Sequence, residues 1–289
     1  MRNRIVIPMI ALLAGLAFSS VMLAQRGIPP PDGWKACPRC QTQQDRREAR
    51  AEYKVDGHPF DPHDLSGIWG YDGVDLDLKT APPLTPWGQQ QYEATKGEFG
   101  LNSKDGMLKC DPLGYPRTLT YNYGMQFVTL PDRVVQFFEM DHTWRDIWTD
   151  GRKLPEDPPE MRWFGWSVGR WEGDEFVVES TGFDDRSWLQ EDYRDRTYGW
   201  PHSDEMRVVE RLKRTSYGNL DVSVTIIDPK TFTKPWVTAA GGGNSPRPAR
   251  SSRMTLSAGT ELWEHFCAPS DNAEYNNRVL FPAAGAAPK

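Results

Sequence analysis

The sequence predicts an all-β domain in which an antiparallel meander closes into a barrel or curls into a strongly curved sandwich. Nearly all of the chain after Met125 alternates apolar and polar residues with period two. No helix-length segments separate the strand-length runs, as parallel strands would require, so we expect an antiparallel sheet. The chain has 289 residues, of which 38% are hydrophobic and 12% aromatic. This composition excludes a disordered protein and provides for a sizeable core.

The first 24 residues are predicted to form a secretory signal peptide. Arg2 and Arg4 precede an apolar run from Ile5 to Ala24, after which the chain becomes polar at Gln25. A membrane-anchoring helix is the alternative, since roughly 20 apolar residues can span a bilayer. Cleavage would place the mature protein in the periplasm or outside the cell, with no remaining membrane segment.

Residues 25–63 are predicted to form an irregular arm that contains the sequence CPRC. Cys37 and Cys40 are followed by His58 and His63 in the pattern C-x2-C-x17-H-x4-H, which loosely resembles a zinc cluster. The favoured alternative is a local disulfide beside two loop histidines, because exported chains usually oxidise such pairs. We therefore expect no metal and no other cofactor.

The barrel domain is predicted to span residues 64–270. It begins with a short strand around Gly67-Ile68-Trp69, followed by a helix over residues 86–97. Thr85 is expected to cap this helix, and Pro86 fits its first position. Residues 271–289 are expected to form a flexible tail.

Eight strand-length runs account for the remainder of the domain. Turn sequences separate several of them, at LPDR (130–133), WEGDE (171–175) and SYGNL (216–220). The runs are MQFVTL, RVVQFFEM, TWRDIWTD, FGWSVGRW, DEFVVEST, MRVVERLKR, LDVSVTII and TELWEHF.

The hairpin over residues 133–149 indicates what lines the barrel. With the reversal near Asp141-His142, one face carries Val134, Gln136, Phe138, Arg145 and Ile147, and the other Val135, Phe137, Glu139, Trp144, Asp146 and Trp148. Neither face is uniformly apolar, which favours a cavity lined by aromatic and charged side chains. Surface positions with structural ion pairs are the alternative. The residues expected to line the cavity are Trp144, Trp148, Trp166, Glu139 and Tyr123.

Four residues are candidates for acid-base chemistry. His142, His202 and Glu210 could exchange protons, and Arg145 could hold an anionic group. No nucleophile elbow, zinc motif or phosphate loop is present. The main functional hypothesis is therefore a small-molecule-binding barrel. A cofactor-free isomerase, cyclase, lyase or hydrolase and a periplasmic protein-interaction module are the alternatives.

The charge balance limits the class of partner. The chain has 34 basic and 40 acidic residues, for a net charge of −6. An acidic protein lacks the broad cationic face that neutralises phosphates, so we expect no nucleic-acid partner. The expected partner is a small, partly apolar molecule.

Four cysteines in an oxidising compartment allow three disulfide pairings. A bridge between Cys110 and Cys267 would close a loop of more than 150 residues. In the chain-entropy model such a bridge contributes about 4–5 kcal/mol. We prefer this pairing, and the other two stay open.

Several motifs resemble those of a large family of exported bacterial proteins without an established activity. They include LTPWG (84–88), DHTWRDIWTDGR (141–152), SVGRWEGDEFVVESTGF (167–183) and PHSDEMRVVER (201–211). The resemblance implies that Cys110 and Cys267 belong to the shared domain and that the CPRC arm is an addition. Separately, Gly67-Ile68-Trp69 resembles the opening strand of lipocalin-like (calycin) barrels, which favours a barrel over a sandwich.

Overall fold

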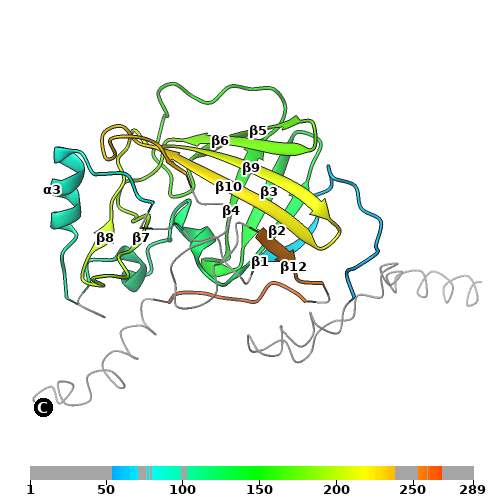
Figure 1. The fold of residues 1–289 in the computed structure, drawn as a ribbon, viewed down its shortest axis with the longest axis horizontal. Helices are drawn as coiled ribbons and strands as arrows, with labels where there is room; N and C mark the ends of the chain where they lie inside the picture. The colour runs from blue at the N-terminus through cyan, green and yellow to red at the C-terminus, as the bar shows by residue number, and fades with distance from the viewer. Residues whose placement is uncertain are drawn as a thin grey trace, which may run out of the picture.

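The structure is a closed β-barrel, and Figure 1 shows its strands with the helix over residues 86–94 to one side. This computed structural model describes residues 54–70, 76, 78, 80–98, 103–237, 253–258 and 260–268. The barrel strands are β1 (Gly67–Gly70), β2 (Gly124–Thr129), β3 (Arg133–Phe138), β4 (Thr143–Trp148), β5 (Trp166–Glu172), β6 (Glu175–Thr181), β9 (Arg207–Ser216), β10 (Asn219–Ile227) and β12 (Arg253–Leu256).

Nine strands close the barrel in the order β10-β12-β1-β2-β3-β4-β5-β6-β9, because β9 pairs with β10. A short strand β11 (Trp236–Val237) adds to the edge of β10. All pairings are antiparallel except that of β4 with β5, where Ile147 lies opposite Ser167. The predicted barrel is thus confirmed, as a mixed and largely antiparallel one.

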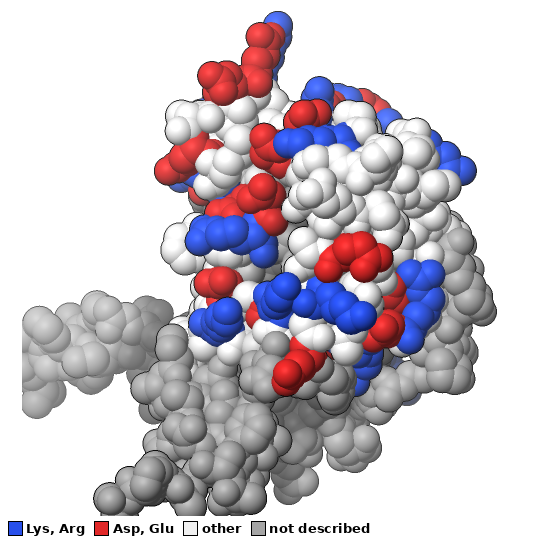
Figure 2. Space-filling model, turned by 90° about the vertical axis from the view of Figure 1, so that its left-hand side faces the viewer, with Lys and Arg blue, Asp and Glu red and all other residues white. Residues whose placement is uncertain are grey.

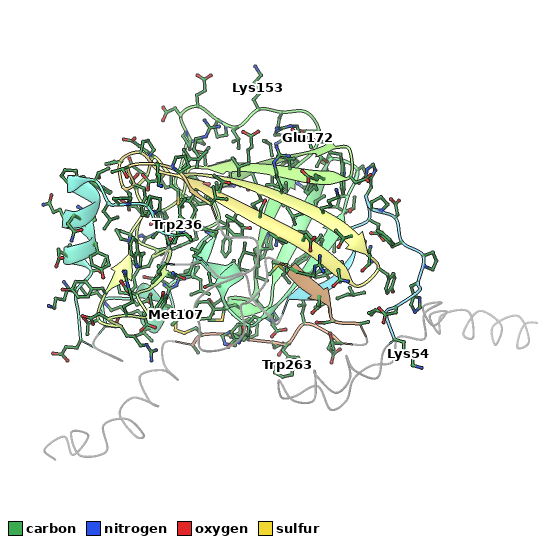
Figure 3. The ribbon with its side chains drawn as sticks, viewed as in Figure 1. Lys54, Met107, Lys153, Glu172, Trp236 and Trp263 are labelled. Carbon is green, nitrogen blue, oxygen red and sulfur yellow. A yellow bond between two sulfur atoms is a disulfide. The ribbon has the colours of Figure 1, made fainter. Side chains whose placement is uncertain are left out.

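The parallel pair arises from the long connection over residues 149–165, which crosses back before β5 begins. This connection contains no helix, and for that reason period-two patterning gave no sign of a crossover. In Figure 3, Lys153 marks this connection at the edge of the barrel, beyond the β5–β6 turn at Glu172.

The predicted turns are confirmed. The β5–β6 hairpin turns at Gly173, whose φ of +59° suits a residue without a Cβ. The β3–β4 reversal passes through the 3-10 turn η4 (Met140–His142), in which Asp141 and His142 have positive φ angles of 58° and 47°.

A short ribbon of β7 (Gln190–Glu191) and β8 (Gly199–Trp200) lies outside the barrel.

Helix α3 (Pro86–Ala94) begins where the sequence predicts, with Pro86 at its first position. The Thr85 side chain accepts a hydrogen bond from the Gly88 amide at 3.0 Å. The helix ends three residues earlier than expected. Thr95 terminates it by turning its hydroxyl toward the carbonyls of Tyr92 and Gly199, at 2.7 and 3.1 Å.

The barrel interior is filled by side chains from alternate strand positions. On β9 the inward residues are Val208, Glu210, Leu212 and Arg214, and on β10 every second residue from Leu220 to Ile226 is buried. On β3 and β4, the face with Gln136 and Arg145 points inward. Polar side chains also point inward: Gln136, Arg145, Glu210 and Arg214 are buried beside the apolar core.

A second buried cluster of aromatic side chains joins the barrel to the region around α3. Trp200, Phe232 and Trp236 have ring centroids 5.6–6.2 Å apart, and Tyr92 of α3 lies 5.5 Å from Trp200. Figure 3 shows Trp236 between the barrel and the helix. These rings form part of the same hydrophobic core as the barrel interior.

Two 3-10 turns, η2 (Gly106–Lys109) and η3 (Arg117–Thr120), connect α3 to the barrel. Cys110 directly follows η2 and is bonded to Cys267, with the two Cα atoms 5.3 Å apart. The preferred disulfide pairing is therefore present.

The run TELWEHF was expected to form a strand, and this expectation is wrong. Residues 260–268 are extended but join no strand, and β12 lies earlier in the chain. We call residues 260–268 the C-terminal strap. The Trp263 amide donates to Glu139 Oε2 at 3.2 Å, and the Asp141 amide donates to His265 Nδ1 at 3.3 Å. These bonds, and not strand pairing, attach the strap to Glu139 and Asp141.

Among the described residues, no helix is long and apolar enough to cross a membrane. The signal-peptide expectation for residues 1–24, the CPRC cysteines Cys37 and Cys40, and the tail over residues 271–289 lie outside the described residues.

Candidate functional site

A hollow on the outer surface of the barrel gathers four tryptophans. This tryptophan groove encloses about 390 Å³ where β4 runs beside the segment that leads into β5. It is lined by Trp144, Trp148, Trp163 and Trp166 together with Arg145, Asp146, Glu160, Met161, Arg162, Phe164, Gly165 and Ser167. Its size falls within the range of small-molecule sites.

The alternation of β4 places two of these tryptophans outside the barrel. Trp144 and Trp148 lie on the face opposite Arg145 and Ile147, which point inward. Trp166 begins β5, whose parallel pairing with β4 brings it to the same side. Trp144 is the most open of them, with 58% of its surface exposed.

A tight turn at Gly165 brings the fourth tryptophan, Trp163, to the groove. The Gly165 amide donates to the Arg162 carbonyl at 3.1 Å, and Gly165 has a φ of +64°. A Cβ at this position would lie 2.7 Å from the Thr181 carbonyl oxygen. Only glycine therefore fits this turn without displacing the backbone.

Arginine side chains stack on the indole rings around the groove. The guanidinium carbon of Arg162 lies 3.6 Å from the centre of the Trp166 ring, and that of Arg152 lies 3.5 Å from the Trp148 ring. These arginines also pair with the carboxylates of Glu160 and Asp150. Stacking of this kind orders the rings and leaves polar groups of both signs at the rim.

The predicted reactive residues Arg145 and Glu210 form a buried ion pair inside the barrel. Arg145 Nη1 lies 2.8 Å from Glu210 Oε2, and Nη2 lies 2.8 Å from Oε1. Gln136 Oε1 accepts from Arg145 Nε at 2.8 Å, and the Tyr115 hydroxyl donates to Glu210. Each of these side chains is at least 97% buried.

The environment of this pair shifts the pKa values of Tyr115 and Arg145. Burial raises the pKa of Tyr115, and its hydrogen bond to the Glu210 carboxylate acts in the same direction. The pKa of Arg145 is raised because the attraction of Glu210 outweighs the effect of burial. The pair thus joins β4 to β9 across the interior, as expected of a structural ion pair.

His202 lies in a different buried cluster, beside Ser187. Its Nδ1 lies 3.1 Å from the Ser203 carbonyl oxygen, and its Nε2 lies 2.9 Å from Ser187 Oγ. Since a carbonyl can only accept, Nδ1 of the neutral ring carries the proton and Nε2 accepts from the serine hydroxyl. Asp228 holds the next residue through the Ser203 amide and hydroxyl, both at 2.7 Å. This tautomer could act as a base toward Ser187.

Burial lowers the pKa of His202, although the Ser203 backbone and nearby carboxylates partly offset this effect. The unfolded chain therefore binds a proton more readily than the folded one below about pH 6.5. We expect the contribution of His202 to the free energy of unfolding to be constant above pH 6.5. Below this pH the contribution should fall by at most about 1.4 kcal/mol per pH unit. Urea unfolding of wild type and His202→Gln at pH 7.5 and 5.5 measures this. An equal loss of stability in both proteins would contradict the assignment.

His142, Glu139 and Tyr123 gather at the C-terminal strap. His142 is exposed and donates from Nε2 to the Trp263 carbonyl at 2.6 Å. Glu139 is buried and accepts from the strap, as described above, and the Tyr123 hydroxyl lies 3.3 Å from His265 Nε2. Of the predicted site residues, these three therefore attach the strap to the barrel end.

The structure thus distributes the predicted site residues over four places. Trp144, Trp148 and Trp166 meet in the groove, whereas the side chains of Arg145 and Glu210 lie inside the barrel. Residues that the sequence argument missed are Trp163, Met161 and Ser187. Trp163 could have been found, because it lies three residues before Trp166 at the start of a predicted strand. No sequence pattern linked Ser187 to His202, which is 15 residues away.

His58 and His63 do not lie together. His58 stacks on Tyr217 with ring centroids 4.8 Å apart, while His63 packs on Trp171 and contacts the Gly173 carbonyl at 2.9 Å. Within the part of the chain that the structure describes, no three His, Cys, Asp or Glu residues are placed to hold a metal ion.

Comparisons with known proteins give no further guide to the site. No family model, curated protein or solved structure was found to match the chain. The family resemblance expected from the sequence motifs therefore stays a prediction, and any function must be argued from the geometry.

Proposed function

We propose that this protein binds a small, partly apolar molecule in the tryptophan groove, outside the barrel. The observation that carries the proposal is the convergence of four indole side chains on one hollow of about 390 Å³. Indole rings supply large apolar surfaces with few rotatable bonds, so they bind planar ligands at a low entropic cost. The filled interior supports a site on the outer surface instead of the lumen.

The rim chemistry supports a ligand that carries a polar group as well as an apolar face. Arg162, Asp146 and Glu160 border the groove beside the tryptophans. Arg162 and Glu160 already pair with each other, so a ligand can exchange one of these contacts for its own. Exposed ion pairs contribute little to stability, and this exchange costs little.

Export from the cytoplasm is part of the proposal. The apolar run from Ile5 to Ala24 behind Arg2 and Arg4 supports a signal peptide. The Cys110–Cys267 disulfide supports an oxidising compartment, since such bridges are rare in the cytosol.

We expect Trp144→Ala to weaken binding of the probe 1-anilinonaphthalene-8-sulfonate about tenfold or more, because the most exposed indole of the groove is lost. Fluorescence titration of the folded protein measures this affinity. Phe137→Ala is the matched control: Phe137 is also an exposed outer-face aromatic, paired across the strands with Trp144, but it does not line the groove. Equal affinity of both variants, or no saturable binding by wild type, would sink the proposal.

The contact between Ser187 and His202 favours acid-base catalysis as a second candidate function. An enzyme would consume its ligand over time and lose turnover in His202→Gln while still binding. A carrier would release the ligand unchanged from both proteins. Chromatography of the ligand after incubation with each protein separates these outcomes.

A further inference from the structure

A second hollow is separate from the tryptophan groove and shares no lining residue with it. It encloses about 500 Å³ between the turns η2 and η3 on one side and β7 with the loop after it on the other. Met107, labelled in Figure 3, marks it close to the β7–β8 ribbon. We call it the Arg117 hollow. Its lining is Ser103, Asp105, Met107, Leu108, Arg117, Thr120, Tyr121, Gln190, Glu191, Tyr193 and Arg196.

The guanidinium of Arg117 is fixed in the wall of this hollow. The side chain is 2% exposed, and both carboxylate oxygens of Asp105 accept from its two terminal nitrogens, at 2.8 Å for Nη1. The Tyr121 hydroxyl lies 3.2 Å from Nη2. Asp105 is itself held by the Met107 amide at 3.1 Å. The donor groups of Arg117 are therefore ordered before any ligand arrives.

One donor of this guanidinium makes no hydrogen bond to the described residues. It is the buried Arg117 Nε, whereas Nη1 and Nη2 each make at least one bond. A buried donor without an acceptor typically costs about 1–3 kcal/mol.

The charges around the hollow cancel. Arg117 is neutralised by Asp105, and Arg196 Nε lies 3.1 Å from Glu191 Oε2. Figure 2 shows basic and acidic residues interleaved over the side of the molecule that carries α3 and the β7–β8 ribbon. A charged ligand would gain no attraction here, because the lining has no net opposite charge. A neutral polar ligand does not depend on such an attraction.

The remaining lining residues provide hydroxyl groups and an aromatic face. Ser103, Thr120, Tyr121 and Tyr193 each carry a hydroxyl that both donates and accepts, and Gln190 adds an amide. The Tyr193 side chain is half exposed at 49%. The face of an aromatic ring is electron-rich and attracts the weakly positive C–H groups of a saturated ring.

We propose that the Arg117 hollow binds a neutral, hydroxyl-rich ring, of which a sugar unit is the common example. Ligand hydroxyls bond to the hydroxyl and amide groups of the lining, and a C–H face of the ligand lies on the ring of Tyr193. This site is separate from the tryptophan groove and binds a ligand of a different chemical class.

The test is a titration of the 15N-labelled protein with glucose, maltose and cellobiose, followed by NMR. We expect amide shifts confined to residues 103–121 and 190–196 for at least one sugar, with dissociation constants in the range of about 1 mM. Tyr193→Ala should weaken this binding about tenfold, whereas Tyr193→Phe, which keeps the ring, should stay within about threefold of wild type. Trp144→Ala should leave sugar binding unchanged, which separates this site from the groove.

Three results would overturn the proposal. The first is the absence of localised shifts up to about 20 mM of every sugar, twenty times the expected dissociation constant. The second is tighter binding of glucuronate than of glucose, which would indicate an anion site. The third is unchanged sugar binding in both Tyr193→Ala and Arg117→Lys, with circular dichroism used to verify that each variant is folded.

Discussion

Replacing Arg145 by Met is expected to lower the free energy of unfolding by about 3–5 kcal/mol, because the Glu210 carboxylate is left buried without its partner. Glu210 is 1% exposed and cannot reach water without opening the barrel between β6, β9 and β10. The Tyr115 hydroxyl would be its remaining donor among the contacts described above. Urea unfolding followed by circular dichroism measures the change.

Two further variants separate this effect from a general loss of packing. Arg170→Met removes a charge from the outer face of β5, where Arg170 pairs with Glu172 and Glu179 while 51% exposed, and should cost at most about 1 kcal/mol. The double variant Arg145→Met/Glu210→Leu removes both buried charges and should recover most of the lost stability. A double variant no more stable than Arg145→Met would contradict the ion-pair explanation.

Loss of the disulfide is expected to have an effect of similar size. The Cys110–Cys267 bridge spans 157 residues, for which the chain-entropy model gives about 5 kcal/mol. We expect Cys110→Ala/Cys267→Ala to unfold at a much lower urea concentration than wild type. The bridge also ties the C-terminal strap to η2, so the variant should lose amide protection at Trp263 and Asp141 first, as hydrogen exchange would show.

Wild type treated with dithiothreitol provides the matched control, because it removes the bridge without changing the sequence. It should reproduce the stability of the double alanine variant. If both lie within about 1 kcal/mol of the oxidised protein, well under the usual range for a native disulfide, the strap is held by its hydrogen bonds alone and the expectation fails.

The strands and their hairpins could be predicted because period-two alternation is a local property. The LPDR turn alone joins the strand-length runs on either side of it. As expected, these runs form β2 and β3, which pair with each other. The same alternation separates Arg145 from its neighbours Trp144 and Asp146. Alternation thus separated the two faces of the hairpin but did not show which one points inward: Trp144 and Trp148 were expected to line the cavity, and they lie outside the barrel.

Contacts between distant segments could not be predicted in this way. The parallel pairing of β4 with β5 depends on a crossover that has no helical pattern, and it is this pairing that creates the tryptophan groove. Trp144 and Arg145 were expected to line one cavity, but successive strand residues point to opposite sides of a sheet. Trp144 therefore lies in the surface groove, and the side chain of Arg145 lies in the buried ion pair.

The C-terminal run illustrates the limit of a local pattern. Residues 260–266 were expected to form a strand, yet they contact the barrel through side-chain acceptors such as Glu139 and pair with no strand of the described structure. Tertiary hydrogen bonds decided the outcome, which a short pattern cannot reveal.

The measurement that tests the central proposal most directly is native mass spectrometry of the protein purified from its own host. A site in the tryptophan groove predicts a noncovalent mass of roughly a few hundred daltons on wild type and on Phe137→Ala, lost on denaturation and reduced on Trp144→Ala. Retention of the full added mass by Trp144→Ala would place the ligand elsewhere and contradict the proposal.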